Sequence, residues 1–166
     1  MRKEFIIPTK ILRKGVKLPT YAHEGDSGMD VRAYGYSYTN SPAITHELLE
    51  DVPFVLESNE RILIKTGIAM SIPNGYEIQV RDRSGCALKS GIMLVNSIGT
   101  IDSIYRGEIG VILYNSDSNK PFIINKEDRI AQLVLIEVPK AILTIVDDLD
   151  KTDREDGGYG STNKME

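Results

Sequence analysis

The sequence predicts an all-β protein: a jelly-roll-like β-barrel or sandwich with one short helix and a flexible C-terminal arm. Apolar residues recur at every second position over most of the chain, and turn signals rich in glycine, proline and asparagine separate these short runs. Many short strands with turns between them are typical of sandwiches and barrels. At 166 residues, the chain is long enough for one domain with a substantial core.

Two paired strands are expected in the middle of the chain. Residues 61–72 alternate between apolar and polar side chains, which indicates a half-buried strand. Residues 73–75 read Pro-Asn-Gly, a strong turn signal, and residues 76–81 alternate again. The pattern therefore predicts a β-hairpin.

The later part of the chain supplies further strands and the helix. Residues 108–114 and 129–138 contain apolar residues at consecutive positions, which is typical of strands covered on both faces. Residues 141–146 are predicted as another strand. Residues 84–90 have convincing helical character, and Gly91 is placed to end that helix.

Two stretches stand outside this pattern. Residues 35–53 predict an irregular surface insertion with one helical turn. Residues 147–166 are charged and then glycine-rich, so they bury little apolar surface and either remain a solvated tail or fold over a ligand. The expected organisation is a β domain over residues 1–146 and a flexible arm over residues 147–166.

Composition excludes several classes of protein. The net charge of −4 and the pI near 5.3 argue against a surface that coats nucleic acid. Cys86 is the one cysteine, which excludes an internal disulfide and favours a reducing compartment. The apolar run near the N-terminus is too short for a signal peptide, and none approaches the roughly 20 residues that span a bilayer. We therefore expect a cytoplasmic protein without a membrane or nucleic-acid partner.

The most informative carboxylate is Asp102, in a run of isoleucines and glycines that predicts a tight hairpin over residues 96–108. Gly99 and Gly107 allow another group to approach the backbone closely. An unpaired carboxylate among apolar groups is costly, so we expect Asp102 to have a partner. A bound polar ligand is one such partner, and an Asx-turn capped by the carboxylate is the other interpretation.

Two segments have the chemistry of phosphate binding. Arg83, Ser84 and Gly85 follow a predicted strand and open the helix, so free N–H groups, a hydroxyl and a guanidinium form an anion site. A plain Ser84 N-cap explains the same tripeptide. Residues 157–162 combine a glycine backbone with an aromatic ring and two hydroxyls, which suits a lid over phosphates and a base. A disordered tail is the alternative.

Five segments, taken in sequence order, resemble the five signature motifs of the trimeric dUTP pyrophosphatase (dUTPase) family: residues 26–33, residues 83–85, residues 99–107, residues 128–133, and Arg154 with residues 157–162. The resemblance covers nearly the whole chain except residues 35–53. It implies a β jelly roll and an enzyme that hydrolyses dUTP to dUMP and pyrophosphate, which keeps uracil out of DNA and supplies dUMP for thymidylate synthesis.

The resemblance also implies roles at the nucleoside end of the substrate. Asp102 holds and activates the water that attacks the α-phosphorus and touches the deoxyribose 3′-hydroxyl. Tyr105 packs under the deoxyribose and leaves no room for a 2′-hydroxyl. Asn96 and the backbone around Gly99 and Ile101 hydrogen-bond the uracil edge and reject cytosine.

At the phosphate end, the resemblance implies contacts to the α- and β-phosphates and a closing arm. The contacts to the α- and β-phosphates are assigned to Arg83, Ser84 and Gln132, with Gly85 beside them. In the closing arm, Arg154 is a catalytic residue at the γ-phosphate and Tyr159 stacks on uracil. The arm also contains the substrate-binding residues Gly160, Ser161 and Thr162. A Mg²⁺ ion is held by the substrate triphosphate without direct protein ligands. Asp30 either orders waters of that ion or pairs with Arg129. The family is a homotrimer with each site shared between subunits, so isolated protomers are expected to be inactive.

The chain departs from the family pattern at four places. Asp82 precedes Arg83 where proline is more usual, Glu155 replaces a glycine, and Tyr159 replaces a phenylalanine. The insertion over residues 35–53 is longer than expected. None of these departures removes a catalytic group.

Two alternative functions follow from the same residues. A dCTP deaminase of the same superfamily places a catalytic glutamate on the strand after Asp102, where this chain has Ile112, which cannot carry a proton. A nucleotide-responsive binding protein is the second alternative, with residues 35–53 as the surface for a regulatory protein partner.

Overall fold

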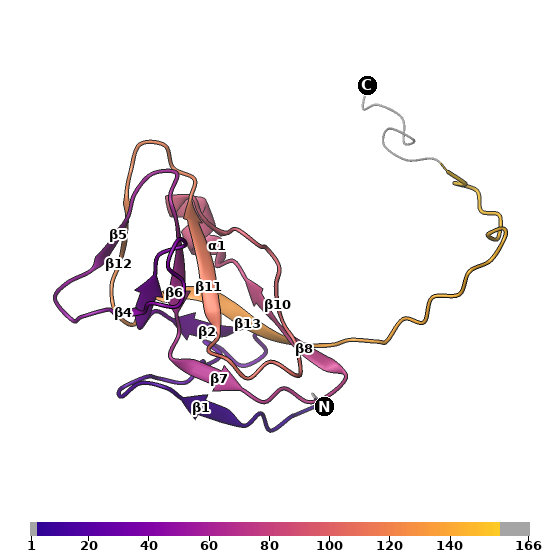
Figure 1. Ribbon diagram of the computed structural model, residues 1–166, viewed down its shortest axis with the longest axis horizontal. Helices are drawn as coiled ribbons and strands as arrows, with labels where there is room; N and C mark the ends of the chain where they lie inside the picture. Colours follow the sequence, from indigo (N-terminus) through magenta and orange to yellow (C-terminus); the bar gives the residue numbers. More distant parts are fainter. Residues whose placement is uncertain (1–2, 157–166) are drawn as a thin grey trace.

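The computed structural model describes residues 3–156, whose strands form two principal antiparallel sheets and two small two-stranded ones. The five-stranded sheet has the order β4-β3-β6-β11-β9, and the four-stranded sheet has the order β10-β8-β13-β2. The small sheets pair β1 with β7 and β12 with β5 (Figure 1). The strands are β1 (Thr9–Ile11), β2 (Met29–Arg32), β3 (Gly35–Ser37), β4 (His46–Glu47), β5 (Phe54–Leu56), β6 (Arg61–Lys65), β7 (Ile68–Met70), β8 (Tyr76–Arg81), β9 (Ile92–Leu94), β10 (Gly99–Ile101), β11 (Gly110–Asn115), β12 (Phe122–Ile124) and β13 (Arg129–Glu137).

The core is built by the inward faces of both principal sheets. Ile64 and Leu113 from the five-stranded sheet are fully buried, as are Ile78 and Leu133 from the four-stranded sheet. Buried and less buried residues alternate along β6 and β11, as a strand with one face on a core requires. The predicted all-β, jelly-roll-like fold is confirmed in its sandwich form, because the described sheets do not close into a barrel.

The hairpin predicted over residues 61–81 is wrong in its pairing. The first strand is split into β6 and β7 at Gly67, whose φ is 73° and where an added Cβ would lie 2.5 Å from Val16 Cγ2. The Pro-Asn-Gly turn does form, since the Tyr76 N–H donates to the Pro73 carbonyl at 3.2 Å. The turn carries the chain from one sheet to another, so β7 pairs with β1 whereas β8 pairs with β10 and β13.

The short helix α1 (Ser84–Ser90) is confirmed with its predicted end. Gly91 has φ 62°, and its N–H donates to the Ala87 carbonyl at 3.1 Å, which caps the helix. Arg83 is the N-cap residue and its side chain makes no capping bond. The Ser84 N-cap interpretation is therefore wrong, and Ser84 is the first helical residue.

Residues 35–53 are more regular than predicted. They contain β3 and β4 of the five-stranded sheet, Leu48 is buried, and no helical turn is present in this stretch. Tyr36 packs against the rings of His46 and Phe54 at centroid distances of 5.1 and 4.4 Å. These aromatic contacts and the pairing with β6 place the stretch in the sheet, which leaves only the connections around it irregular.

The chain leaves the β-sheets after β13, and residues 139–156 extend away from them (Figure 1). The strand predicted over residues 141–146 is absent, and Leu143 and Ile145 are almost fully exposed. A strand needs a neighbour for its backbone N–H and C=O groups, and this segment has none within the described part of the chain. A division of the chain at residue 146 stays a prediction.

No helix among residues 3–156 combines the length and the apolar character that crossing a bilayer requires. The cytoplasmic location stays a prediction from the sequence.

Candidate active site

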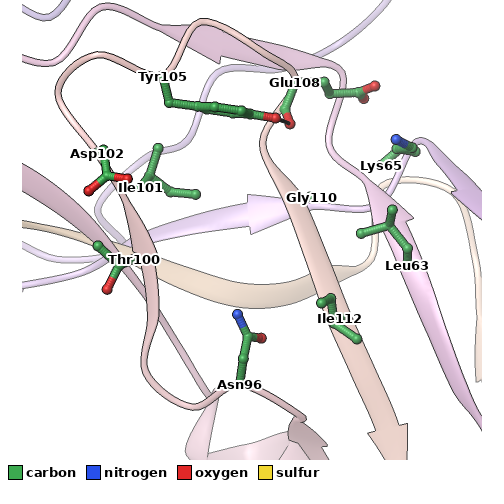
Figure 2. Close-up of a pocket in the computed structure, with 10 residues that line it drawn as sticks. All are labelled: Leu63, Lys65, Asn96, Thr100, Ile101, Asp102, Tyr105, Glu108, Gly110 and Ile112. Atoms are coloured by element: carbon green, nitrogen blue, oxygen red, sulfur yellow. Dashed lines mark hydrogen bonds between the residues drawn. The ribbon is translucent and has the colours of Figure 1, made fainter. Parts of the chain in front are cut away.

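A cavity of about 270 Å³ lies between the end of β10 and the start of β11 (Figure 2). It brings together four of the residues singled out from the sequence: Asn96, Ile101, Asp102 and Tyr105. The rest of the lining comes from β6, β10, β11 and the turn before β11, namely Leu63, Lys65, Thr100, Glu108, Gly110 and Ile112.

The turn after β10 is held by its own hydrogen bonds. The Tyr105 N–H donates to the Asp102 carbonyl at 3.0 Å, and the Tyr105 hydroxyl donates to the Glu108 carbonyl at 3.0 Å. A Cβ on Gly107 would lie 2.3 Å from that hydroxyl oxygen, so only glycine leaves space for the ring. The predicted hairpin is a turn without a ladder, because β10 pairs with β8 and β11 pairs with β6 and β9.

The Asp102 carboxylate is exposed at the mouth of the cavity and has no hydrogen-bond or ion-pair partner among residues 3–156. Its backbone carbonyl closes the turn, so the Asx-turn interpretation does not apply. The expectation that burial forces a partner on Asp102 is also wrong, since exposure removes the desolvation cost. The carboxylate can therefore accept hydrogen bonds from a ligand or a water in the cavity.

The opposite end of the cavity is lined by Asn96, which lies close to the backbone of Gly99. The Asn96 amide points into the space between β10 and β11 (Figure 2). A Cβ on Gly99 would lie 3.2 Å from Asn96 Nδ2 and 3.3 Å from Val80 Cβ, so this backbone packs closely against both. An amide offers a donor and an acceptor together, which suits the edge of a pyrimidine.

A second group of predicted residues gathers around the buried carboxylate of Asp30 on β2. Asp30 Oδ1 accepts from Arg83 Nε at 3.2 Å and from Gln132 Nε2 at 3.4 Å, and Oδ2 accepts from Arg129 Nη1 at 3.1 Å. The side chain of Asp30 is 7% exposed. Asp30 thus pairs with Arg129 and fixes the directions of Arg83 and Gln132 as well.

The start of α1 continues this second group. Arg83 Nη1 donates to the Arg129 carbonyl at 2.9 Å, and the N–H groups of Ser84 and Gly85 have no partner among the described residues. A Cβ on Gly85 would meet nothing within 4 Å, so the space beside the Gly85 Cα is open. Two free N–H groups, a hydroxyl and a guanidinium are suited to bind phosphate oxygens.

The two groups remain separate within one chain. Arg83, Ser84, Gly85 and Gln132 do not line the cavity that holds Asp102. Arg154 lies on the exposed segment beyond β13 and does not line it either. The predicted positions Tyr159, Gly160, Ser161 and Thr162 lie outside the described residues.

Sequence reasoning missed the pairing of Arg13 with Glu108, which lines the cavity. Arg13 donates to both carboxylate oxygens of Glu108, with Nη2 to Oε2 at 3.0 Å, and to Glu47 Oε1 at 2.8 Å. The hydrogen bond to Glu108 is the main cause of the raised pKa of Arg13. Glu108 also accepts from the Gly67 N–H at 2.8 Å. The 95 residues between the partners leave no local signal of this contact.

Comparison with known proteins agrees with the motifs. The dUTPase family model matches residues 46–163. A deoxyuridine 5′-triphosphate nucleotidohydrolase of Fusobacterium nucleatum is 43% identical over 159 residues, which cover 95% of this chain and 98% of that protein.

Solved structures show the same fold. A variant dUTPase of the 80alpha phage superposes with a TM-score of 0.75 at 26% identity, covering 95% of this chain and 98% of that one. A variant dUTPase from phage phi11 of S. aureus, described with a structural Mg(II) ion, superposes with a TM-score of 0.71 at 23% identity, covering 89% of this chain and all of that one. The chain therefore belongs to the dUTPase family.

Proposed function

We propose that this chain hydrolyses dUTP to dUMP and pyrophosphate with the water-activating carboxylate of Asp102. The observation that carries the proposal is one cavity that joins an aromatic ring, an amide and a carboxylate with no partner among residues 3–156. A water oxygen held by Asp102 forms a bond to the α-phosphorus, and the bond from that phosphorus to the bridging oxygen breaks. Pyrophosphate leaves, and Asp102 takes the proton of the water.

The cavity selects the nucleoside by shape and by hydrogen bonds. The Tyr105 ring lies under the deoxyribose, where a 2′-hydroxyl would collide with it. The Asn96 amide and the backbone at Gly99 and Ile101 pair with the uracil edge. A cytosine would leave buried polar groups unpaired, which makes discrimination large.

The phosphates bind the group at Arg83, Ser84, Gly85 and Gln132, which Asp30 holds in position. Because this group does not line the Asp102 cavity of its own chain, one site needs parts from different subunits of a homotrimer. The exposed apolar side chains of Ile142, Leu143 and Ile145 support an assembled state, since isolated chains rarely leave such a run uncovered. Arg154 then reaches the γ-phosphate, and the arm with Tyr159, Gly160, Ser161 and Thr162 closes over the nucleotide.

A Mg²⁺ ion enters with the triphosphate. The described residues contain no cluster of three His, Cys, Asp or Glu that could hold a metal, and both oxygens of Asp30 already accept from side chains. The donor set therefore fits an ion carried by the phosphate oxygens better than one held by the protein. When bound, the ion would neutralise charge on the triphosphate and fix its conformation. Asp30 acts by positioning Arg83, Arg129 and Gln132.

The deaminase alternative is not favoured. Ile112 of β11 lines the cavity at the place where a deaminase needs a glutamate, and an alkyl side chain cannot carry a proton. Formation of dUTP or dUMP from dCTP would contradict this assignment.

A regulatory protein partner is a second candidate function. For the 80alpha phage dUTPase, a link between its enzymatic activity and its capacity to induce SaPI has been described. In this chain the insertion exposes Tyr38, Ile44 and Val52 to solvent. Since Tyr36 of β3 pairs with His46 of β4, substitution of Tyr38, Ile44 and Val52 by serine, which keeps the backbone, is the appropriate test in a pull-down. Retained binding of a partner by this variant would exclude the surface.

The test of the main proposal is pyrophosphate release from dUTP, dCTP, dTTP and UTP in parallel, with Mg²⁺ and then with excess chelator. We expect release from dUTP alone and its loss on chelation. Release from dCTP or UTP at the same rate would contradict the assignment of Asn96 and Tyr105. If the assembled protein releases pyrophosphate from none of these nucleotides, the proposed activity is wrong and a nucleotide-binding protein with the same fold becomes the favoured function.

A further inference from the structure

The carboxylate of Asp82 connects the Asn96 end of the cavity to β8, the strand that leads into the residues around Arg83. Asp82 lies between β8 and α1, immediately before Arg83. Its Oδ1 accepts from the Leu94 N–H at 2.5 Å, and its Oδ2 accepts from the Ser97 hydroxyl at 2.7 Å. One half-buried side chain thus holds both the end of β9 and the loop that follows it.

The contact with Leu94 occupies an edge of the sheet that no strand within residues 3–156 covers. The Val95 N–H points toward β11, where it donates to the Ile112 carbonyl at 3.0 Å. Successive N–H groups of a strand point to opposite sides, so the Leu94 N–H points away from β11. Since β9 is the last strand of the five-stranded sheet, Asp82 supplies the acceptor that a neighbouring strand would otherwise provide.

The loop held in this way carries the Asn96 amide. Asn96 lies between the two groups that Asp82 binds, and it lines the cavity. Further along, Gly99 pairs with Val80 and packs against it. The loop is therefore fixed at both ends to one short segment, since Val80 and Asp82 are two residues apart.

We propose that Asp82 is a positioning residue that sets the uracil specificity of the cavity by fixing the Asn96 loop relative to β8. The inference rests on the proposed function, because it assigns the base to Asn96. Asp82 does not line the cavity. Its effect falls on the base and not on the phosphates, because Arg83 is held independently by Asp30 and the Arg129 carbonyl.

Three variants separate the roles of the carboxylate. Asp82→Ala removes both acceptors, and Ser97→Ala removes one bond at an exposed residue with little risk to folding. Asp82→Asn is the matched control, because its carbonyl can accept from Leu94 while its amide donates to the Ser97 oxygen.

For each variant we would measure kcat and KM for dUTP, the ratio of kcat/KM for dUTP and dCTP, and inhibition by inorganic tripolyphosphate. For Asp82→Ala we expect KM to rise about 10-fold or more and the selectivity to fall similarly, as the loss of charged hydrogen bonds predicts. The kcat and the tripolyphosphate inhibition should stay unchanged. Ser97→Ala should fall between the wild type and Asp82→Ala, and Asp82→Asn should remain close to the wild type. An unchanged selectivity, or an equal loss of tripolyphosphate binding, would overturn the proposal.

Amide hydrogen exchange gives a readout that does not depend on activity. We expect faster exchange at Leu94 and through residues 95–99 in Asp82→Ala, with exchange in β13 unchanged. Unchanged amide exchange at Leu94 in Asp82→Ala would show that Asp82 does not hold the loop, and would overturn the proposal whatever values of kcat and KM are measured. If the wild type releases no pyrophosphate from dUTP, the proposed function fails by that result alone, and exchange still decides whether Asp82 holds the loop.

Discussion

At the scale of single residues, the position of Asp102 explains its proposed chemistry. A carboxylate acts as a general base when one of its oxygens can reach the proton that it takes, and this one has no partner among the described residues that would compete with a water. The turn that carries it is closed by backbone groups and by Tyr105, so the side chain is free while its Cα is fixed. Substitution of the carboxylate should therefore affect turnover more than structure.

Asp102→Asn should retain nucleotide binding and lose turnover by about 10²- to 10⁴-fold, because an amide cannot take the proton of the attacking water. Single-turnover hydrolysis of dUTP and binding of a non-hydrolysable dUTP analogue would measure the two effects separately. Asp51→Asn, at an exposed carboxylate that does not line the cavity, is the matched control. Normal turnover by Asp102→Asn would show that another group is the base.

Gly107→Ala should displace the Tyr105 ring, since the new Cβ would lie 2.3 Å from the hydroxyl oxygen and 2.5 Å from Cζ. We expect the KM for dUTP to rise and the preference over UTP to fall by about 10-fold, the order expected for losing a well-packed contact. Tyr105→Phe is the comparison, because it removes only the hydrogen bond to the Glu108 carbonyl and keeps the ring. Equal discrimination by Gly107→Ala and the wild type would contradict the role of the ring.

At the scale of elements, the cavity depends on contacts that join distant strands. Arg13 reaches from the segment after β1 to Glu108 before β11 and to Glu47 in β4. The side chains of Arg13 and Glu108 are only 16% and 15% exposed. Removing one partner would leave the other charge mostly buried, which costs more than the pair itself contributes.

Arg13→Met should therefore lower the free energy of unfolding by about 3 kcal/mol, the low end for a broken buried pair. Denaturant unfolding followed by fluorescence or circular dichroism would measure the change. Arg61→Met, at an exposed position of β6, is the matched control and should change stability by less than about 0.5 kcal/mol. A loss no larger than that of the control would mean that the pair contributes little.

The same contacts show what sequence reasoning could and could not predict. The alternation of β8, the helix closed by Gly91 and the turn at residues 73–75 all follow local rules, and all are present. Which strands pair does not follow local rules. Gly67 splits the first strand, and the turn at residues 73–75 then carries the chain to another sheet, so the 61–81 hairpin is wrong. The resemblance predicted Asn96, Asp102 and Tyr105, which line one cavity, whereas the pairing of Arg13 with Glu108 required the fold.

At the scale of the whole molecule, the segment after β13 raises the question of what covers it. Ile142 is 85% exposed, Leu143 95% and Ile145 99%, an arrangement that costs free energy in water. These residues precede Arg154, so a docked segment would also bring the arm toward a neighbouring subunit. Assembly and catalysis are then expected to depend on different parts of the C-terminal region.

Two truncations distinguish these parts. Removal of residues 154–166 deletes Arg154 and the proposed closing arm, so dUTP turnover should collapse while the β fold and the proposed trimer persist. Removal of residues 139–166 also deletes the apolar segment, and the trimer should then dissociate at micromolar concentration, since burial of its side chains is worth about 25 cal/mol per Å². Sedimentation of both variants, with circular dichroism as the control for folding, measures the outcome. Full activity after the shorter truncation would contradict the arm's role, and an intact trimer after the longer one would mean that the sheets alone hold the subunits together.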